Sequence, residues 1–175
     1  MRLSGRSIAF LFLVFLILTP FGHHALEATE IDEMVGRRLS LTFTDLLGGG
    51  EMTTRSDAED RQATLLVFWS TECGPCLREI PALNKLYAEW SPKGLEIFGI
   101  SQDRRPERVI DITQRFGITW PQYLETGEPL EKPFTAALGI AGTPSLILLD
   151  AEGTIVAAGF DNPEAVLTHF LNAGK

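Results

Sequence analysis

The sequence predicts an α/β domain with a central β-sheet flanked by helices. Two continuous apolar runs, residues 65–69 and 95–100, are typical of strands that are covered on both faces. A segment with apolar residues at helical spacing separates them, which predicts a parallel βαβ unit with a right-handed crossover. Near the C-terminus, the runs SLILLD and TIVAAG are joined by three residues and predict a β-hairpin.

The composition fits one globular domain with a short additional segment. Hydrophobic residues make up 45% of the 175 residues, which is enough for a buried core. The formal net charge of −8 disfavours a nucleic-acid partner, because such a partner needs a clustered basic face. No run of Lys or Arg in the chain exceeds two residues.

Residues 1–26 are set apart from the rest of the chain. Arg2 and Arg6 precede an apolar run over residues 8–18, which is typical of a secretory signal and shorter than the roughly 20 residues of a membrane span. Ala28 suits a cleavage site, but Leu26 stands where a small residue is preferred, so an uncleaved membrane anchor remains an alternative. In either case we expect residues 27–175 to form the folded domain and to be exported.

The first half of the domain shows a hairpin, then strand, helix, strand and helix. Alternating apolar residues at 39, 41 and 43 and three glycines at 48–50 predict an N-terminal β-hairpin. After the strand at 65–69, one apolar stripe at helical spacing comprises Cys76, Ile80, Leu83, Tyr87 and Trp90. After the strand at 95–100, Pro106 begins a second helix and Gly117 ends it.

The second half is less regular. Residues 120–141 mix proline, glycine and charge, and we expect only a short helix around 132–138 there. After the C-terminal hairpin, Asn162 caps a last helix that starts at Pro163. The inward-facing residues of that helix are Val166, Leu167, Phe170 and Leu171.

The chain has two cysteines, Cys73 and Cys76, placed where the strand at 65–69 gives way to the first helix. Free backbone N–H groups and the helix dipole favour a thiolate at such a position and lower the cysteine pKa. We therefore expect Cys73 to attack a substrate disulfide and Cys76 to resolve the mixed disulfide. Gly74 lets a partner chain approach closely, and Pro75 has a helical φ.

Two other uses of a cysteine pair fit the sequence less well. A structural disulfide between residues this close closes only a small ring, and a C-x-x-C motif beside a βαβ pattern is typical of redox chemistry. A structural zinc site needs four ligands, but the only histidines are His23, His24 and His169. We therefore expect no metal and no other cofactor.

The motif CGPC after FWSTE resembles the thioredoxin superfamily. The longer stretch CGPCLREIP resembles more closely the TlpA/ResA-type reductases, which are exported and periplasmic or membrane-anchored, and whose motif is C-x-x-C-x-x-E-x-P. The similarity extends over residues 35–170 and includes GTPSLILLDAEGTIV. It implies a thioredoxin-like fold with a central mixed β-sheet, an extra N-terminal hairpin and an insertion before a strand that follows a cis-proline.

The resemblance also implies a function. It points to a thiol–disulfide oxidoreductase in the periplasm, soluble or held at the inner membrane by an uncleaved N-terminus. Such an enzyme reduces disulfides of client proteins, for example in cytochrome c or metal-site maturation. It is itself reduced by an upstream thiol electron donor, which we expect to be membrane-bound.

Two further site assignments depend on the resemblance. It implies a cis peptide bond at Thr143–Pro144 and places substrate on the backbone there, although a proline that merely begins a strand is the alternative. Glu79 lies three residues after Cys76, on the same helical face, and is the candidate proton acceptor for the resolving thiol. Thioredoxin has a buried acid six residues before its first cysteine, but the residue at that position here is Val67, which cannot accept a proton. The alternative for Glu79 is an exposed acid that favours its helix N-terminus.

Glu72 departs from the family pattern, because relatives usually have Trp immediately before the first cysteine. A negative charge there should raise the pKa of Cys73 and favours a partner with a basic or polar approach face. Trp69 is expected beside the site, partly in the core and partly on its rim. The predicted substrate-binding residues are Trp69, Glu72, Gly74, Pro75, Thr143 and Pro144.

Two rival functions share this fold class. A peroxiredoxin-like peroxidase would need a P-x3-T-x2-C pattern; Ser70 fits one position of it, but Leu66 stands where proline should be. A Sco-like copper chaperone uses C-x3-C with a distant histidine, and the spacing of Cys73 and Cys76 does not match.

Overall fold

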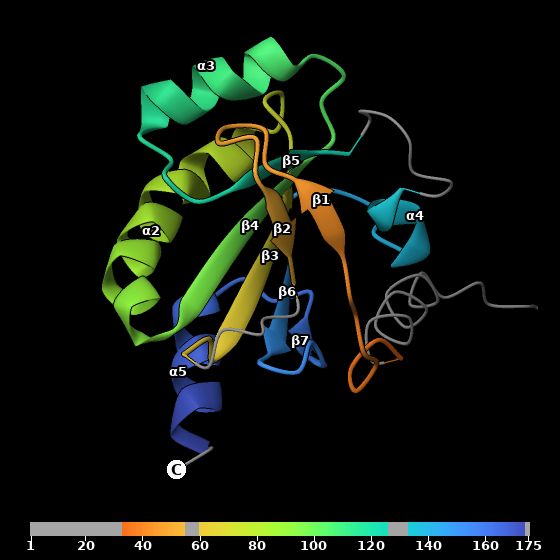
Figure 1. Ribbon diagram of the computed structural model, residues 1–175, viewed down its shortest axis with the longest axis vertical. Coiled ribbons are helices and arrows are strands. Elements are labelled where there is room, and N and C mark those ends of the chain that lie inside the picture. Colours follow the sequence, from red (N-terminus) through yellow and green to blue (C-terminus); the bar gives the residue numbers. More distant parts are fainter. Residues whose placement is uncertain (1–32, 55–59, 126–132, 174–175) are drawn as a thin grey trace, which may run out of the picture.

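The computed structural model describes residues 33–54, 60–125 and 133–173, which fold around a five-stranded sheet (Figure 1). The order across the sheet is β5–β4–β3–β6–β7. β3 pairs in parallel with β4, and β4 with β5, whereas β6 is antiparallel to both β3 and β7. The strands are β3 (Ala63–Trp69), β4 (Leu95–Ser101), β5 (Gln122–Leu124), β6 (Ser145–Asp150) and β7 (Ile155–Ala158). The predicted mixed sheet is confirmed.

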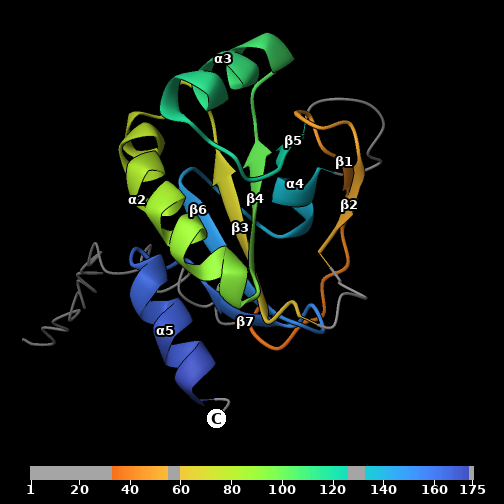
Figure 2. The same cartoon turned by 60° about the vertical axis from the view of Figure 1, so that its left-hand side comes forward.

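Helices cover the two faces of the sheet unequally. α2 (Gly74–Trp90) and α5 (Pro163–Ala173) lie on one face, and the short α4 (Phe134–Ala137) lies on the other with the N-terminal hairpin (Figure 2). A 3-10 turn (Ser91–Lys93) ends α2. α3 (Pro106–Phe116) connects β4 to β5 and ends at Gly117, whose φ of 64° suits a left-handed cap. These bounds match the predicted helix signals closely.

The sheet divides the core into two layers because its central strands have inward side chains on both faces. On the first face, alternate residues of β3 and β4 pack against α2, α3 and α5, with Ile80, Leu83, Val109 and Leu167 among the buried helical side chains. The other residues of those strands meet the N-terminal segment and α4. That second layer contains Phe43, Phe98, Tyr123 and Phe134, with Phe43 edge-on to Phe98 at 5.1 Å.

The N-terminal segment crosses the second face from one sheet edge to the other. Its hairpin is β1 (Thr42–Thr44) and β2 (Glu51–Thr53), as predicted. Before the hairpin, Ile155 of β7 donates its N–H to the carbonyl of Arg37 and accepts from Gly36 N–H. After β1, Leu46 N–H donates to the carbonyl of Gln122 in β5. We call residues 36–46 the strap.

Two predictions need comment. Residues 120–141 contain α4 as expected, but they also contain β5, which the sequence analysis missed. Its three residues pair with Gly99–Ser101 and are too few to show a strand period. The proposed leader, residues 1–26, lies outside the described residues, as do residues 27–32. Within the described ranges, the structure has no helix of the length and apolar character that crossing a membrane requires.

Candidate active site

The register of the sheet brings three chain segments to one end of the molecule. Trp69, the last residue of β3, is opposite Ser101, the last residue of β4. Phe68 is opposite Ser145, the first residue of β6. The loop that carries Cys73, the loop after β4 and the turn before β6 therefore open at the same edge, as expected for a site at strand ends.

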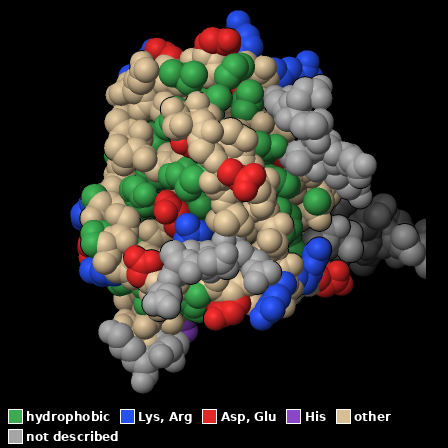
Figure 3. Space-filling model, in the orientation of Figure 1, with side chains coloured by type: hydrophobic (Ala, Val, Ile, Leu, Met, Phe, Trp, Pro, Cys, Tyr) green, Lys and Arg blue, Asp and Glu red, His purple; other side chains and the backbone are tan. Residues whose placement is uncertain are grey.

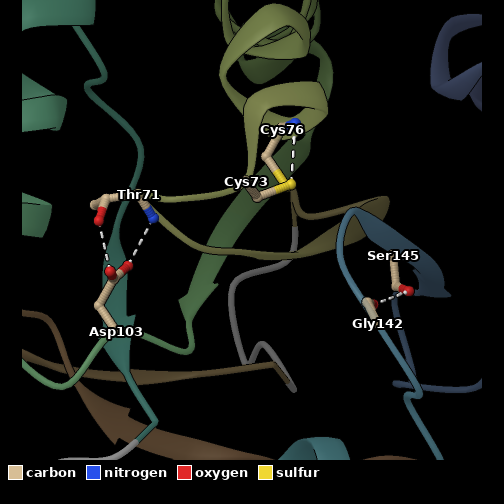
Figure 4. Close-up of a disulfide and its surroundings, with 6 residues drawn as sticks. All are labelled: Thr71, Cys73, Cys76, Asp103, Gly142 and Ser145. Carbon is tan, nitrogen blue, oxygen red and sulfur yellow. Dashed lines mark hydrogen bonds between the residues drawn. A yellow bond between two sulfur atoms is a disulfide. The ribbon is translucent and has the colours of Figure 1, made fainter.

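Cys73 and Cys76 form a disulfide at the start of α2 (Figure 4). Cys73 is the N-cap of this helix, and its Sγ accepts a hydrogen bond from Cys76 N–H at 3.2 Å. Cys76 is only 3% exposed, whereas Cys73 is partly exposed. A partner molecule can therefore reach Cys73 more easily than Cys76, while the attacking and resolving roles of the two sulfur atoms stay a prediction.

A buried carboxylate fixes the loop that leads to Cys73. Asp103 accepts hydrogen bonds from Thr71 N–H at 2.8 Å and from the Thr71 hydroxyl at 2.6 Å (Figure 4). It also accepts from the Ser101 hydroxyl at 2.7 Å, and it is 8% exposed. The sequence analysis missed Asp103. Its position three residues after the apolar run at 95–100 was the one available signal, because strand ends of parallel sheets meet at such sites.

The Thr143–Pro144 peptide bond is cis, as predicted. The turn that contains it is closed by the Ser145 hydroxyl, which donates to the carbonyl of Gly142 at 2.7 Å. Figure 4 shows this turn on one side of the disulfide, with Thr71 and Asp103 on the other side. Thr143 and Pro144 also line a cavity of about 360 Å³ with Met34.

Glu79 lies on α2 three residues after Cys76 and is partly buried. Burial raises the pKa of its carboxyl group above the ordinary 4.5, and the negative charge of Asp161 raises it further. The positive charge of Arg78 acts in the opposite direction but is the weakest of the three influences. A carboxyl group of raised pKa is better suited to accept and return a proton near neutral pH.

The prediction that Trp69 forms part of the substrate-binding rim is wrong. Trp69 is 1% exposed, and its indole N–H donates to Gln122 Oε1 at 3.0 Å. The side chain lies in the core because its strand is covered on both faces. Gly74 and Pro75, in contrast, are exposed beside Cys73, so a partner can approach them.

Glu72 is exposed beside Cys73, as predicted, but its charge is not isolated. Its carboxylate forms an ion pair with the guanidinium of Arg108 from α3. The predicted effect of Glu72 on the pKa of Cys73 stays a prediction, and the ion pair with Arg108 should weaken it. The two residues are 36 positions apart, and only the folded chain brings them together.

Comparison with known proteins agrees with this geometry. Residues 38–158, which include the disulfide and the cis-proline, match the model of the AhpC/TSA family. The chain belongs to the AhpC/TSA family. Its similar relatives include the thiol–disulfide oxidoreductase ResA of Halalkalibacterium halodurans, which is 33% identical over 95 residues. That match covers 54% of this chain and 52% of the relative, so the chain spans about half the length of the curated relatives it matches.

Solved structures extend the comparison for this AhpC/TSA chain. The thioredoxin domain of a thiol–disulfide oxidoreductase from Bacteroides vulgatus is 28% identical, with a TM-score of 0.65. The match covers 80% of this chain and 96% of that domain. A thiol:disulfide interchange protein from a Bacteroides species is 27% identical over 81% of this chain and 91% of its own, also with a TM-score of 0.65. The predicted thioredoxin-like fold and the resemblance to ResA-type proteins are confirmed.

The site of this AhpC/TSA chain consists of amino-acid side chains and backbone. In the described ranges, His, Cys, Asp and Glu side chains do not gather in groups of three or more that could hold a metal ion. Three groups of the site can take part in chemistry: the two sulfur atoms and one carboxyl group. The sulfur of Cys73 is partly exposed, that of Cys76 is buried, and the carboxyl group of Glu79 lies on the same helix.

Proposed function

We propose that this chain is an extracytoplasmic thiol–disulfide oxidoreductase that reduces disulfides of client proteins. The observation that carries the proposal is the partly exposed Cys73 at the start of α2, bonded to the buried Cys76. A sulfur at a helix N-terminus is stabilised as the thiolate, which is the form that attacks disulfides. The names of the ResA relatives and of the Bacteroides structures support the same activity.

The reaction begins with the reduced protein. The Cys73 thiolate attacks one sulfur of the client disulfide, so that a mixed disulfide forms and one client thiolate leaves. Cys76 then loses its proton and attacks Cys73 Sγ, which releases the second client thiolate and forms the Cys73–Cys76 bond. Two electrons pass to the client, whose two thiolates take up two protons. In this proposal, the Cys73–Cys76 disulfide corresponds to the oxidised form that the reaction leaves.

Other residues have supporting roles in the proposal. Glu79 receives the proton of Cys76, because its raised pKa and its place on α2 suit that transfer. The backbone at Thr143–Pro144 binds an extended client segment, and the exposed Gly74 and Pro75 allow that segment to come close to Cys73. An upstream thiol donor, membrane-bound in this proposal, then reduces the disulfide again.

The proposed location depends on the N-terminal sequence. The basic flank and apolar run of residues 1–18 support export to the periplasm, with the domain either released or held at the inner membrane. Proteins in which disulfides must be opened before haem or metal insertion are the proposed clients. This client class derives from the family resemblance.

Trapping tests the proposal directly. In Cys76→Ser, the mixed disulfide cannot be resolved, so the variant should retain client proteins that a reducing gel then releases. Cys73→Ser is the matched control and should retain none. Equal trapping by both variants would contradict the assignment of Cys73 as the attacking sulfur.

The reduction potential of the Cys73–Cys76 couple tests the direction of electron flow. Related oxidoreductases span about −270 to −120 mV, and a reductase should lie in the lower half of that range. A value in the upper half would mean that the protein oxidises its clients. The reduced protein should neither consume hydrogen peroxide at a catalytic rate nor bind Cu(I) tightly, as the rival functions would require.

A further inference from the structure

A cavity of about 390 Å³ lies beside the active-site loop, between that loop and the start of α3. Ser70 and Glu72 line it from the loop that leads to Cys73. The opposite wall comes from the segment between β4 and α3 and from the first turn of α3. The residues of that wall are Gln102, Asp103, Arg104, Arg105 and Arg108.

The charges around this cavity do not cancel. Arg108 is paired with Glu72, and the carboxylate of Asp103 is buried and accepts hydrogen bonds from Thr71 and Ser101. Arg104 and Arg105 are exposed, and no acidic side chain in the described part of the chain forms an ion pair with either. The residues that line the cavity carry three positive and two negative charges, a net charge of +1, in a protein whose net charge is −8.

A further arginine lies near the disulfide on α2. A Cβ atom added to Gly74 would be 3.5 Å from Nη1 of Arg78, so this guanidinium lies over the glycine next to Cys73. In Figure 3, both blue and red side chains lie along the upper edge of the molecule, where α3 lies in Figure 1. Around Cys73, four arginines (Arg78, Arg104, Arg105 and Arg108) therefore outnumber the carboxylates of Glu72 and Asp103, although the chain as a whole is acidic.

We propose that this cavity binds carboxylate side chains that flank the disulfide of a client protein. The inference rests on the proposed function and adds the chemistry of the client surface. A guanidinium group binds a carboxylate through two parallel hydrogen bonds, and exposed positive charges also speed the encounter with an acidic partner.

This proposal reverses the expectation drawn from Glu72 alone, which favoured a basic or polar partner. The reversal follows from the fold. Arg108 neutralises Glu72, and the loop after β4 adds Arg104 and Arg105, which lie more than 30 positions further along the sequence.

Three cyclic peptides test the inference with the full-length reduced protein. Each is closed by one disulfide of the same ring size, and the residues that flank the cysteines are Glu in the first, Gln in the second and Lys in the third. Acid-quenched samples separated by chromatography give the rate of peptide reduction. We expect the Glu peptide to react about three- to tenfold faster than the Gln peptide at low salt, and the Lys peptide to be slowest. The preference should shrink at about 1 M salt.

The variant Arg104→Gln/Arg105→Gln should bring the ratio of Glu to Gln peptide rates close to one. Arg115→Gln is the control, because it removes a positive charge at the other end of α3, about 15 Å along the helix axis from the N-cap Arg105. The control should keep the wild-type ratio. Since all three arginines are exposed, circular dichroism should show that each variant is folded.

The outcomes separate the two proposals. Equal rates for the three peptides with wild-type protein, or a Glu preference that persists in Arg104→Gln/Arg105→Gln, would overturn the acidic-client inference and leave the reductase function standing. Failure of the reduced wild-type protein to open any of the three peptides would instead overturn the proposed function.

Discussion

Glu79 combines a raised pKa with a position on the helix that carries both sulfur atoms. We expect Glu79→Gln to slow resolution of the mixed disulfide by about a hundredfold, the lower end for loss of a general base. Rapid-quench measurement of how fast the mixed disulfide disappears at several pH values would show this slowing. Glu89→Gln, an exposed acid on the same helix, is the control. Superimposable pH profiles for Glu79→Gln and wild type would remove Glu79 from the mechanism.

Glu79→Gln should slow the reaction but should not destabilise the folded protein at neutral pH. Because folding raises the pKa of Glu79, the folded protein holds this proton to a higher pH than the unfolded chain does. Stability therefore falls as the pH rises through the ordinary value of 4.5 and above it. Glu79→Gln should be at least as stable as wild type at pH 7, and the two should converge below about pH 4.5. A loss of stability at pH 7 would mean a structural role.

The pair of Glu72 and Arg108 sets the local charge beside Cys73. Arg108→Gln leaves the Glu72 carboxylate without this partner, so we expect its negative charge to raise the pKa of the Cys73 thiol. Glu72→Gln/Arg108→Gln should return it close to the wild-type value. Thiolate absorbance at 240 nm measures both. Identical titration curves for all three proteins would show that the ion pair has no influence on Cys73.

At the scale of single residues, short motifs and the family resemblance that they carry predicted the place of the cysteine pair, the cis-proline and the place of Glu79 on α2. The sequence analysis did not find the partner of Glu72, which is on another element, and it was wrong about the exposure of Trp69. The hydrogen-bond partner of the Trp69 indole, Gln122, lies 53 positions away. Contacts of this kind are not present in a local pattern.

At the scale of elements, β4 and β5 meet at a glycine that has no room for a side chain. A Cβ atom on Gly99 would lie 2.2 Å from Oε1 of Gln122, the same atom that accepts the indole N–H of Trp69. Gly99→Ala should therefore displace Gln122, break that hydrogen bond and lower the free energy of unfolding by about 1–3 kcal/mol. Urea unfolding measures the loss.

Gly50→Ala is a suitable control for that experiment, because nothing lies within 4 Å of an added Cβ atom there. Its stability should stay within about 0.5 kcal/mol of wild type. Equal effects of the two substitutions would mean that crowding at Gly99 is not the cause.

Helices and long strands were predictable because each has local signals of its own. Pro106 and Gly117 delimit α3, and Asn162 caps α5 through its Oδ1, which accepts from Ala165 N–H. β5 had no such signal. Its identity as a strand comes from pairing with β4, and that pairing exists only after α3 has brought the chain back to the sheet edge.

At the scale of the whole molecule, the second core layer depends on the N-terminal strap. Phe43 is buried and contacts Phe98 and Tyr123 at 5.1 Å between ring centres. Phe43→Ala should lower the free energy of unfolding by about 3–5 kcal/mol. Because both layers share one sheet, we expect redox activity and tryptophan fluorescence to be lost at the same urea concentration.

Leu47→Ala is the matched control, because Leu47 lies just beyond the strap and is 41% exposed. Its free energy of unfolding should change by less than about 0.5 kcal/mol. Retention of activity after loss of fluorescence in Phe43→Ala would show that the strap folds separately from the redox site.

The strap has a further effect on how other chains can associate with the sheet. At one margin, Ile155 has both its N–H and its carbonyl taken by Arg37 and Gly36; at the other, Gln122 donates to Asp45 and accepts from Leu46. An extended segment of another chain cannot pair as a sixth strand at these two residues, since their outward hydrogen-bonding groups are already satisfied. Self-association by strand addition is blocked at these two residues as well. We therefore expect client chains to bind at the end of the sheet where Cys73 is exposed.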